Sequence, residues 1–225
     1  LFQALAKACN AHQLAWDCAC GSGQAALGLV DYFEHITATD ASQTQIDAAI
    51  VHPKIDYRVA KAHTSSLTSG SVDLITVAQA LHWFAQDDFY QEVKRVARPK
   101  ALLAVWGYGR WVIQEPFVNR LMQIFYDDTL GDYWPKERVI IENGYRDLSL
   151  PFDEVHTPQM SMQATWTLKQ MMDYMNTWSA CTRYEAALGV NPLDALRLQC
   201  AELGLKPTQS FALQWPLSQR WFRVN

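Results

Sequence analysis

The sequence lacks the features of a membrane protein and of a nucleic-acid-binding protein. No run of residues approaches the length of about 18 consecutive apolar residues that a transmembrane helix needs, and no signal peptide precedes the first expected helix, from Leu1 to about Ala11. The net charge is only -4, and no basic stripe marks a surface for RNA or DNA. These absences predict a soluble protein of the cytoplasm, with neither a membrane nor a nucleic acid as its partner.

Cysteine is present, but without the pattern of a metal site or a disulfide framework. An odd number of thiols without zinc-type spacing predicts free cysteines in a reducing compartment and no bound metal. The five are Cys9, Cys18, Cys20, Cys181 and Cys200. The chain also lacks an initiator methionine and opens in a helix-like stretch, so we expect that a further segment precedes Leu1 in the intact protein.

The first half of the chain alternates strand-like and helix-like segments. Strands are expected at residues 14–18, 35–39, 55–60, 72–78 and 101–107, and helices at 24–33, 42–51 and 87–97. Such alternation predicts a doubly wound, Rossmann-like α/β fold with a parallel sheet. With 225 residues, of which 49% are hydrophobic, we expect one domain over residues 1–225, whose residues 1–109 form a cofactor-binding half.

Residues 110–225 are richer in aromatic side chains and are expected to form a helical insertion on the substrate side, followed by closing strands. A capping box from Thr167 to Gln170 predicts a helix to about Leu188, and Asn191-Pro192 predicts another helix to about Leu203. Residues 211–224 are expected to form a strand pair or a long edge strand. The aromatic residues suit a packed core, and a helical region over the sheet's carboxyl edge would also serve as a substrate lid.

The most informative segment runs from Trp16 to Gln24 and predicts a strand, a glycine turn and the start of a helix. Gly21 and Gly23 permit a turn that residues with a Cβ resist, so a cofactor can approach bare backbone. Asp40 ends the next strand, where a carboxylate accepts hydrogen bonds from ribose hydroxyls. We interpret this segment as a site for S-adenosylmethionine (SAM).

Two other interpretations of this segment stay open. Residues 21–26 also fit the G-x-G-x-x-G/A pattern of nicotinamide-dependent oxidoreductases. Asp17 favours SAM, because a carboxylate just before the turn suits a cationic cofactor and would repel a pyrophosphate at the helix N-terminus. The third interpretation is an acidic residue that only caps an ordinary turn.

Several segments together resemble the class I SAM-dependent methyltransferases of type 11, and among them the trans-aconitate methyltransferase-like proteins. The Gln-Ala-x-His-Trp-Phe element is the most specific of them. The segments are residues 17–24, 38–42, 71–74, 78–84, 92–99 and 104–108, with further similarity at 133–135, 177–180 and 215–217.

The resemblance implies SAM as the cofactor and assigns most of the candidate site residues. It places His82 and Trp83 on the acceptor side, where they are the catalytic candidates. It implies cofactor contacts for Asp17, Ala19, Gly21, Gly23, Gln24, Asp40, Ala41, Ser42, Ala62, His63, Gln79 and Ala80.

The chain departs from the family pattern at three places. Ala19 stands where a glycine is usual, His63 replaces an acidic residue that reads the adenine amino group, and Lys100-Ala101 replaces a glycine pair. A neutral histidine can offer the adenine amino group one ring nitrogen as an acceptor, but no carboxylate.

The predicted function is methyl transfer from SAM to a small-molecule acceptor, at a carboxylate or hydroxyl oxygen. An ionised carboxylate needs no base, whereas a hydroxyl would profit from one, and His82 is the candidate base unless its ring only packs in place. The alternatives are a SAM-binding or small-ligand-binding protein without turnover and a nicotinamide-dependent oxidoreductase. Neither the acceptor nor the oligomeric state follows from the sequence.

Overall fold

The computed structural model describes residues 1–225, and the chain divides into two compact units. The first unit comprises Leu1–Tyr108, Ile140–Met160 and Leu217–Asn225. The second comprises Gly109–Val139 and Ser161–Pro216. All of the predicted cofactor half, residues 1–109, except Gly109 thus lies within the first unit, which also takes in two segments from the later part of the chain.

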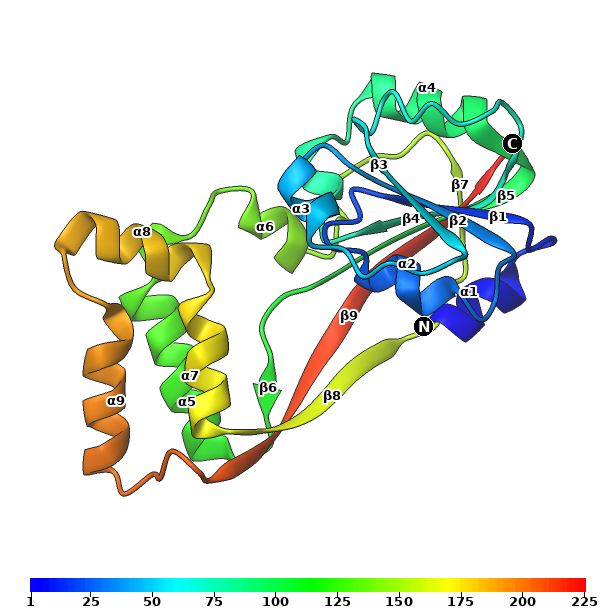
Figure 1. Cartoon of the computed structure of the whole chain (residues 1–225). Coiled ribbons are helices and arrows are strands. Elements are labelled where there is room, and N and C mark those ends of the chain that lie inside the picture. Colours follow the sequence, from blue (N-terminus) through cyan, green and yellow to red (C-terminus); the bar gives the residue numbers. More distant parts are fainter. The chain divides into compact units, whose positions relative to one another are not determined.

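The first unit is built on a mainly parallel sheet (Figure 1). Its strands are β1 (Leu14–Cys18), β2 (His35–Asp40), β3 (Ile55–Val59), β4 (Val72–Ala78), β5 (Ala97–Tyr108), β7 (Asp153–Val155) and the later part of β9 (Ser210–Val224). The order β3-β2-β1-β4-β5 is parallel throughout, and β9 follows β5 in the antiparallel sense. The predicted doubly wound α/β fold is confirmed.

Helices cover both faces of this sheet, as Figure 1 shows. On one face, α1 (Phe2–Ala8) and α2 (Gln24–Leu29) pack with the buried side chains of β1, β2 and β4. On the other face lies α4 (Asp87–Val96), whose buried Phe89 and Val93 follow the helical spacing of an amphipathic helix. The carboxyl ends of the parallel strands therefore stay free for a ligand between two helical layers.

The predicted alternation of strand and helix is wrong between β3 and β4, where residues 60–71 form a loop without a helix. Ser65 and Leu67 of this loop are buried, and the backbone N–H and hydroxyl of Ser65 donate to the carboxylate of Glu92 on α4. Side-chain acceptors thus take the place of helical hydrogen bonds in this segment.

Two helices after the first strands are shorter than the sequence predicts. The helix α2 ends at Leu29 instead of Phe33, and α3 (Gln43–Asp47) ends well before Val51. The predicted start of this helix at residue 42 is confirmed, because the Ser42 hydroxyl caps α3 by accepting from the backbone N–H of Gln45 at 3.4 Å. Such short helices depend on their packing against the sheet more than on their own hydrogen bonds.

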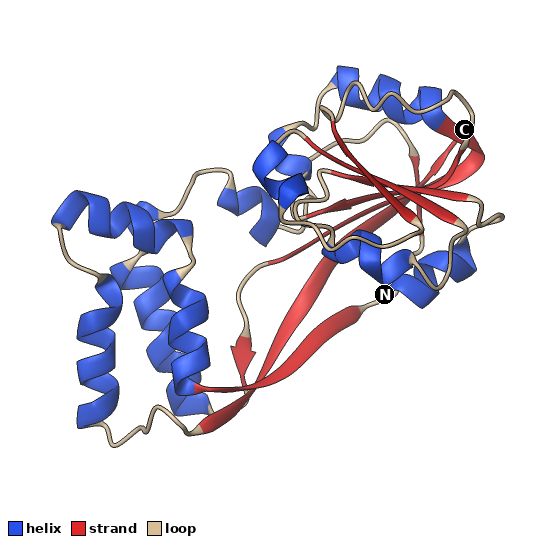
Figure 2. Cartoon of the chain, viewed as in Figure 1, coloured by secondary structure: helices blue, strands red, loops and turns tan.

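The second unit is mostly helical (Figure 2). Its elements are β6 (Val112–Ile113), α5 (Pro116–Ile124), a π-helical turn at Phe125–Thr129, a 3-10 turn at Gly131–Tyr133, β8 (Met160–Thr167), which begins in the first unit, α7 (Leu168–Asn176), α8 (Ser179–Leu188), α9 (Pro192–Glu202) and the first part of β9. The short helix α6 (Arg138–Glu142) spans a boundary between the units.

The predicted helix caps of this unit are confirmed, but one predicted helix boundary is wrong. The capping box of Thr167 and Gln170 is formed, and Asn191 caps α9 by accepting from the N–H of Leu193 at 2.9 Å. The single helix expected from Thr167 to Leu188 is wrong: the backbone of Trp178 is extended and separates α7 from α8. Local caps mark helix starts, whereas this break has no proline or glycine that would announce it.

The aromatic residues of the second unit pack mainly on one another. The ring of Trp111 lies 5.4–6.1 Å, between ring centroids, from those of Trp166, Tyr174, Trp178 and Trp215. Trp111 and Trp215 are buried, whereas Trp166, Tyr174 and Trp178 are half-buried, so this aromatic cluster is a buried core only in part. The lid role of this region stays a prediction.

The last strand differs from its prediction as a strand pair or an edge strand. β9 is one strand of 15 residues, and it lies inside the sheet. Its Leu217–Val224 part pairs with β5, and β7 pairs with the same part of β9. Its buried side chains alternate from Phe211 to Trp215, whereas the neighbours Trp221 and Phe222 are both buried because they pack into two different core clusters. None of the helices of the chain has the length and apolar character to cross a bilayer.

Candidate cofactor site

A hollow of about 460 Å³ lies at the carboxyl ends of β1, β2 and β4, within the first unit. The predicted residues that line it are Ala19, Gly21, Gln24, Asp40, Ala41, Ala62, Gln79, Ala80 and Trp83. Asp17, Gly23, Ser42, His63 and His82 were predicted as site residues but are not part of the lining. The carboxyl edge of an open α/β sheet is where such folds bind ligands.

The two glycines of the turn have different surroundings. Both have left-handed backbones, with φ of +55° at Gly21 and +88° at Gly23. A Cβ on Gly21 would meet only Gln45 Oε1, at 3.6 Å, so the backbone here borders open space. A Cβ on Gly23 would lie 2.3 Å from the hydroxyl of Tyr57, a buried group without a hydrogen-bond partner. Gly21 thus leaves room for a ligand, whereas Gly23 leaves room for a side chain of β3.

Asp40 ties the glycine turn to the end of β2. One carboxylate oxygen accepts from the N–H of Gly21 and the other from the N–H of Ser42, both at 2.9 Å. A carboxylate has about four acceptor positions, so each oxygen keeps capacity for a further donor. Asp40 lines the hollow, which makes that capacity accessible to a ligand hydroxyl.

Asp17 is fully buried and has only protein groups as its hydrogen-bond donors. Its carboxylate accepts from the hydroxyl of Thr76 at 2.8 Å and from the N–H of Ala26, in the first turn of α2, at 3.0 Å. Burial raises the pKa of Asp17 to about 7, although these two hydrogen bonds work in the opposite direction. This geometry supports a role in holding α2 and the glycine turn to the sheet, and a contact of Asp17 with the cofactor stays a prediction.

Two residues of the lining adopt backbone conformations that side chains disfavour. Ala19 has φ +55° and Gln79 has φ +57°. The left-handed region costs a residue with a Cβ about 1–2 kcal/mol, and such strain gathers at functional sites. Gln79 is held in place because its amide Nε2 donates to the carbonyl of Tyr108 at 2.9 Å.

His82 and Trp83 lie in a 3-10 turn, Leu81–Trp83, that follows β4 after Gln79 and Ala80. The side chain of Trp83 is 65% exposed and borders the hollow. The His82 ring lies beside it, with 4.7 Å between the ring centroids, and the buried Tyr145 ring lies on a nearly parallel plane at 6.3 Å. β4 stops at Ala78, as the sequence predicts, so His82 and Trp83 lie beyond its carboxyl end.

His63 and Ser42 border the hollow without lining it. His63 Nδ1 lies 3.4 Å from the carboxylate of Asp88, at the start of α4, and its neighbour Ala62 supplies the wall. The Ser42 hydroxyl caps α3. Nδ1 of His63 thus has a partner within the protein, and the predicted contact of a His63 ring nitrogen with adenine stays a prediction.

The sequence missed several lining residues. They are Ser22, Gln45, Ala60, Ala78 and Phe84. A signal existed for each: Ser22 lies between the glycines, Gln45 three residues after Ser42 in the first turn of the predicted helix 42–51, Ala60 and Ala78 at strand ends, and Phe84 in the specific aromatic element. Only Gln45 comes from a helix, and helix orientation cannot be read from spacing alone.

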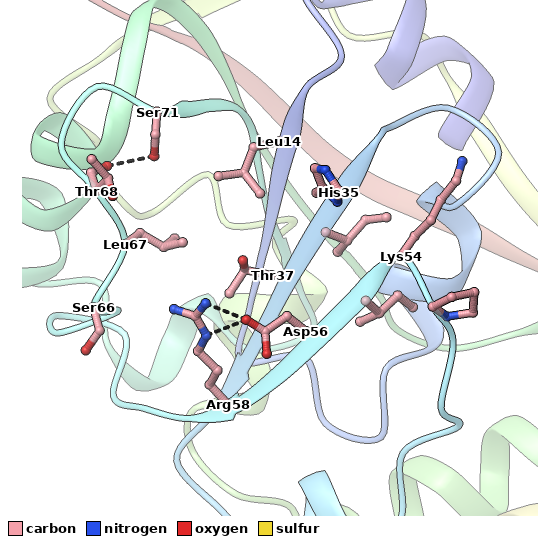
Figure 3. A pocket seen from close by; sticks show the side chains of 13 residues that line it. Leu14, His35, Thr37, Lys54, Asp56, Arg58, Ser66, Leu67, Thr68 and Ser71 are labelled. Carbon is pink, nitrogen blue, oxygen red and sulfur yellow. Dashed lines mark hydrogen bonds and ion pairs between the residues drawn. The ribbon is translucent and has the colours of Figure 1, made fainter.

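A second hollow of about 450 Å³ lies among the amino ends of β1, β2 and β3 (Figure 3). Its guanidinium group, from Arg58, donates to the carboxylate of Asp56 at 2.7 Å. No predicted site residue lines it, and open α/β sheets bind ligands at the opposite strand ends. The first hollow is therefore the candidate site.

The family model of the methyltransferase domain matches residues 16–105, which include every residue lining the candidate site. The structure of a protein from Anaeromyxobacter dehalogenans, provisionally described as a type II methyltransferase, is also similar. It is 37% identical, and the match covers 99% of this chain and 94% of that protein, with a TM-score of 0.93.

Two curated relatives give the same result. A Dictyostelium discoideum protein, provisionally described as a methyltransferase, is 37% identical over 171 residues, which are 74% of this chain and 64% of that protein. A Saccharomyces cerevisiae protein, provisionally described as a SAM-dependent methyltransferase, is 23% identical over 206 residues, 75% of this chain and 69% of that protein. The match with the first of them thus spans less than two thirds of its length.

The chain belongs to the class I SAM-dependent methyltransferases. SAM is the cofactor of this family, and the candidate site fits it: the hollow has the size of a small-molecule pocket, one wall is bare glycine backbone, and a carboxylate with spare acceptor capacity lines it. The nicotinamide alternative is set aside by these matches. The names of these relatives include no methyl acceptor, so the trans-aconitate-like assignment stays a prediction.

The two glycines predict separable effects of substitution. We expect Gly21→Val to lower SAM affinity below detection while lowering the free energy of unfolding by only about 1–2 kcal/mol, the cost of a left-handed backbone. Gly23→Val should destabilise the fold more, because it also collides with Tyr57. Urea unfolding and calorimetric titration with SAM measure both. Equal stability losses, or retained SAM binding in Gly21→Val, would contradict this distinction.

The buried carboxyl of Asp17 predicts a pH dependence of stability. Because its pKa is raised to about 7, the folded state binds this proton more tightly than the unfolded chain, and ionisation costs stability between about pH 4 and pH 7. In Asp17→Asn the amide can still accept from Ala26 and donate to Thr76. We expect its unfolding free energy, relative to the natural protein, to rise by more than about 1 kcal/mol across this range and then level off. A difference that stays flat from pH 4 to 8 in urea unfolding, without cofactor, would be incompatible with this expectation.

Proposed function

We propose that this chain transfers a methyl group from SAM to a small-molecule acceptor, at a carboxylate or hydroxyl oxygen, with the cofactor in the hollow described above. The observation that carries the proposal is the pairing of bare backbone at Gly21 with the carboxylate of Asp40 on the wall of one cavity. A cavity at the carboxyl ends of the strands, with bare backbone and a carboxylate on its wall, suits the ribose and methionine parts of SAM.

The residues of the turn bind and orient the cofactor. Asp40 would accept hydrogen bonds from the ribose hydroxyls, since its oxygens are already aligned by Gly21 and Ser42. Ala41 and Ala62 would form the walls beside the adenine, and their small side chains leave room for a flat ring. Gln79, fixed by its hydrogen bond to Tyr108, would lie at the methionine side of the hollow.

On the acceptor side the protein mainly has to orient the reactants. Bound SAM supplies a methyl group that its sulfonium already activates, so positioning of the acceptor in line accounts for much of the catalysis. The exposed ring of Trp83 offers a flat apolar surface for the acceptor. His82, whose ring packs between Trp83 and Tyr145, would accept a proton from a hydroxyl acceptor and would only position a carboxylate.

A SAM-binding protein without turnover is the second candidate. Methyl transfer requires no obligatory base, so no single residue of the site distinguishes turnover from binding alone. Release of S-adenosylhomocysteine during a screen of small acids and alcohols separates the two, since binding alone releases none. The cytoplasmic location, the small-molecule partner and the absence of a nucleic-acid partner stay predictions of the composition.

The role of Asp40 is tested by Asp40→Ala. We expect SAM binding to weaken by more than about 1.5 kcal/mol, or about tenfold in Kd, because the ribose hydroxyls lose a charged acceptor and stay unpaired. Asp31→Ala, at an exposed position of the same unit, is the control and should bind as the natural protein does. An unchanged Kd in calorimetric titration of a folded Asp40→Ala would place the cofactor elsewhere.

The acceptor-side role of His82 is tested by His82→Ala. SAM affinity should stay within about threefold, while the rate of methyl transfer falls. A loss of about 10²-fold with a hydroxyl acceptor would identify a general base, and a smaller, pH-independent loss would identify positioning. His35→Ala, at an exposed histidine at the amino end of β2, is the control. If His82→Ala transfers methyl groups at the rate of the natural protein with every acceptor, or loses SAM binding, the acceptor-side role of His82 is contradicted.

A further inference from the structure

The loop of residues 60–71 borders both hollows of the first unit. Its first part, with Ala60 and Ala62, lines the candidate cofactor site. Its later part, with Ser66 and Leu67, lines the second hollow, where Figure 3 shows the loop curving past the strand ends. A loop of this length without helical hydrogen bonds needs other partners to hold one conformation.

The helix α4 supplies these partners from three positions at helical spacing. Asp88, Glu92 and Arg95 are four and three residues apart, which places them on one face of the helix. Asp88 pairs with His63 at 3.4 Å, and Arg95 donates to the hydroxyl of Ser69 at 3.0 Å. Both of these outer contacts are solvent-exposed and therefore weak.

The central contact, between Glu92 and Ser65, is different because it is buried. One oxygen of Glu92 accepts from the N–H of Ser65 at 2.8 Å and from its hydroxyl at 2.5 Å. The guanidinium group of Arg95 donates to both carboxylate oxygens, each at 2.8 Å. The Ser65 hydroxyl in turn accepts from the N–H of Leu67 at 3.2 Å. One carboxylate thus determines the path of the backbone on either side of Ser65.

The electrostatics agree with a permanently ionised Glu92. The hydrogen bonds from Arg95 are the largest cause that lowers the pKa of Glu92, to about 2, and the bonds from Ser65 add to the effect. Its side chain is only 8% exposed, so water competes little for these bonds. At neutral pH the carboxylate of Glu92 is therefore ionised and available to accept these hydrogen bonds.

We propose that Glu92 is a positioning residue for the adenosine part of SAM, which acts through Ser65 to fix Ala62 on the wall of the cofactor site. Glu92 itself does not line the site, and two residues separate Ser65 from Ala62, so its effect on the ligand passes through the loop backbone. This inference rests on the proposed placement of SAM in the hollow.

A purely stabilising role would make Glu92 equivalent to Asp73, and the chain offers that comparison. Asp73 is a second buried carboxylate with an arginine partner: it accepts from the N–H groups of Gln13 and Leu14 at 2.8 and 3.0 Å, and from Arg98 at 2.7 Å. Its contacts lie at the amino end of β1, opposite to the candidate site. In Glu92→Gln and Asp73→Asn the amide keeps one acceptor oxygen, but both variants lose the negative charge and an acceptor for the arginine partner.

The test compares Glu92→Gln, Ser65→Ala and the control Asp73→Asn. The Kd of S-adenosylhomocysteine is measured by calorimetric titration, at a temperature well below the Tm of the least stable variant. We expect Glu92→Gln to raise this Kd about fivefold or more, Ser65→Ala to raise it in the same direction, and Asp73→Asn to change it less than twofold, although both carboxylate variants lower Tm. Ser65→Ala keeps Glu92 paired with Arg95 and serves if Glu92→Gln does not fold.

Asp40→Ala belongs in the same series because it tests the site itself. If Asp40→Ala weakens binding while Glu92→Gln and Ser65→Ala stay within twofold of the natural protein, the positioning role is overturned and the site stands. The role is also overturned if Asp73→Asn weakens binding as much as Glu92→Gln does, since the effect is then general destabilisation. An unchanged Kd in Asp40→Ala overturns the site and this inference together.

Discussion

The hydrogen bond from the N–H of Gly21 to the carboxylate of Asp40 is the interaction on which the candidate site depends. It joins the turn after β1 to the end of β2, and the second oxygen of Asp40 fixes Ser42 and so the start of α3. Asp17, on β1, adds a further connection. Its carboxylate accepts from the N–H of Ala26 and the hydroxyl of Thr76, which holds the first turn of α2 to β4. Two carboxylates therefore shape the backbone, and only Asp40 lines the hollow, where a ligand can reach its remaining acceptor positions.

Two residues with a Cβ, Ala19 and Lys100, adopt left-handed backbones, with φ of +55° and +65°. The family resemblance implies a glycine at both of these positions. The backbone geometry is thus kept although the residue that favours it is gone, at a cost of about 1–2 kcal/mol each. Surrounding packing must supply that energy, since Ala19 packs against the core beside β1 and the Lys100 carbonyl accepts from Arg223. Strain at Ala19 and Gln79 is concentrated where the hollow lies.

The loop after β3 is held by a few polar and charged contacts, where a helix would be held by its packed apolar face. Buried apolar area holds a helix to a sheet over many residues, whereas this loop relies on Glu92, Ser65 and their neighbours. The position of one wall of the site therefore depends on a single carboxylate, that of Glu92. It also explains why His63, next to the site in the sequence, pairs with Asp88 of α4 instead of lining the hollow.

The sequence by itself determined the parallel sheet, the glycine turn, the position of Asp40 and the caps of α3, α7 and α9, because each depends on local residue chemistry or on a period within one segment. Tertiary structure alone decided the rest. The missing helix between β3 and β4 depends on a carboxylate 27 residues away. The burial of Asp17, the opposite surroundings of Gly21 and Gly23, and the inner place of β9 likewise depend on contacts between segments distant in the chain, which no local pattern contains.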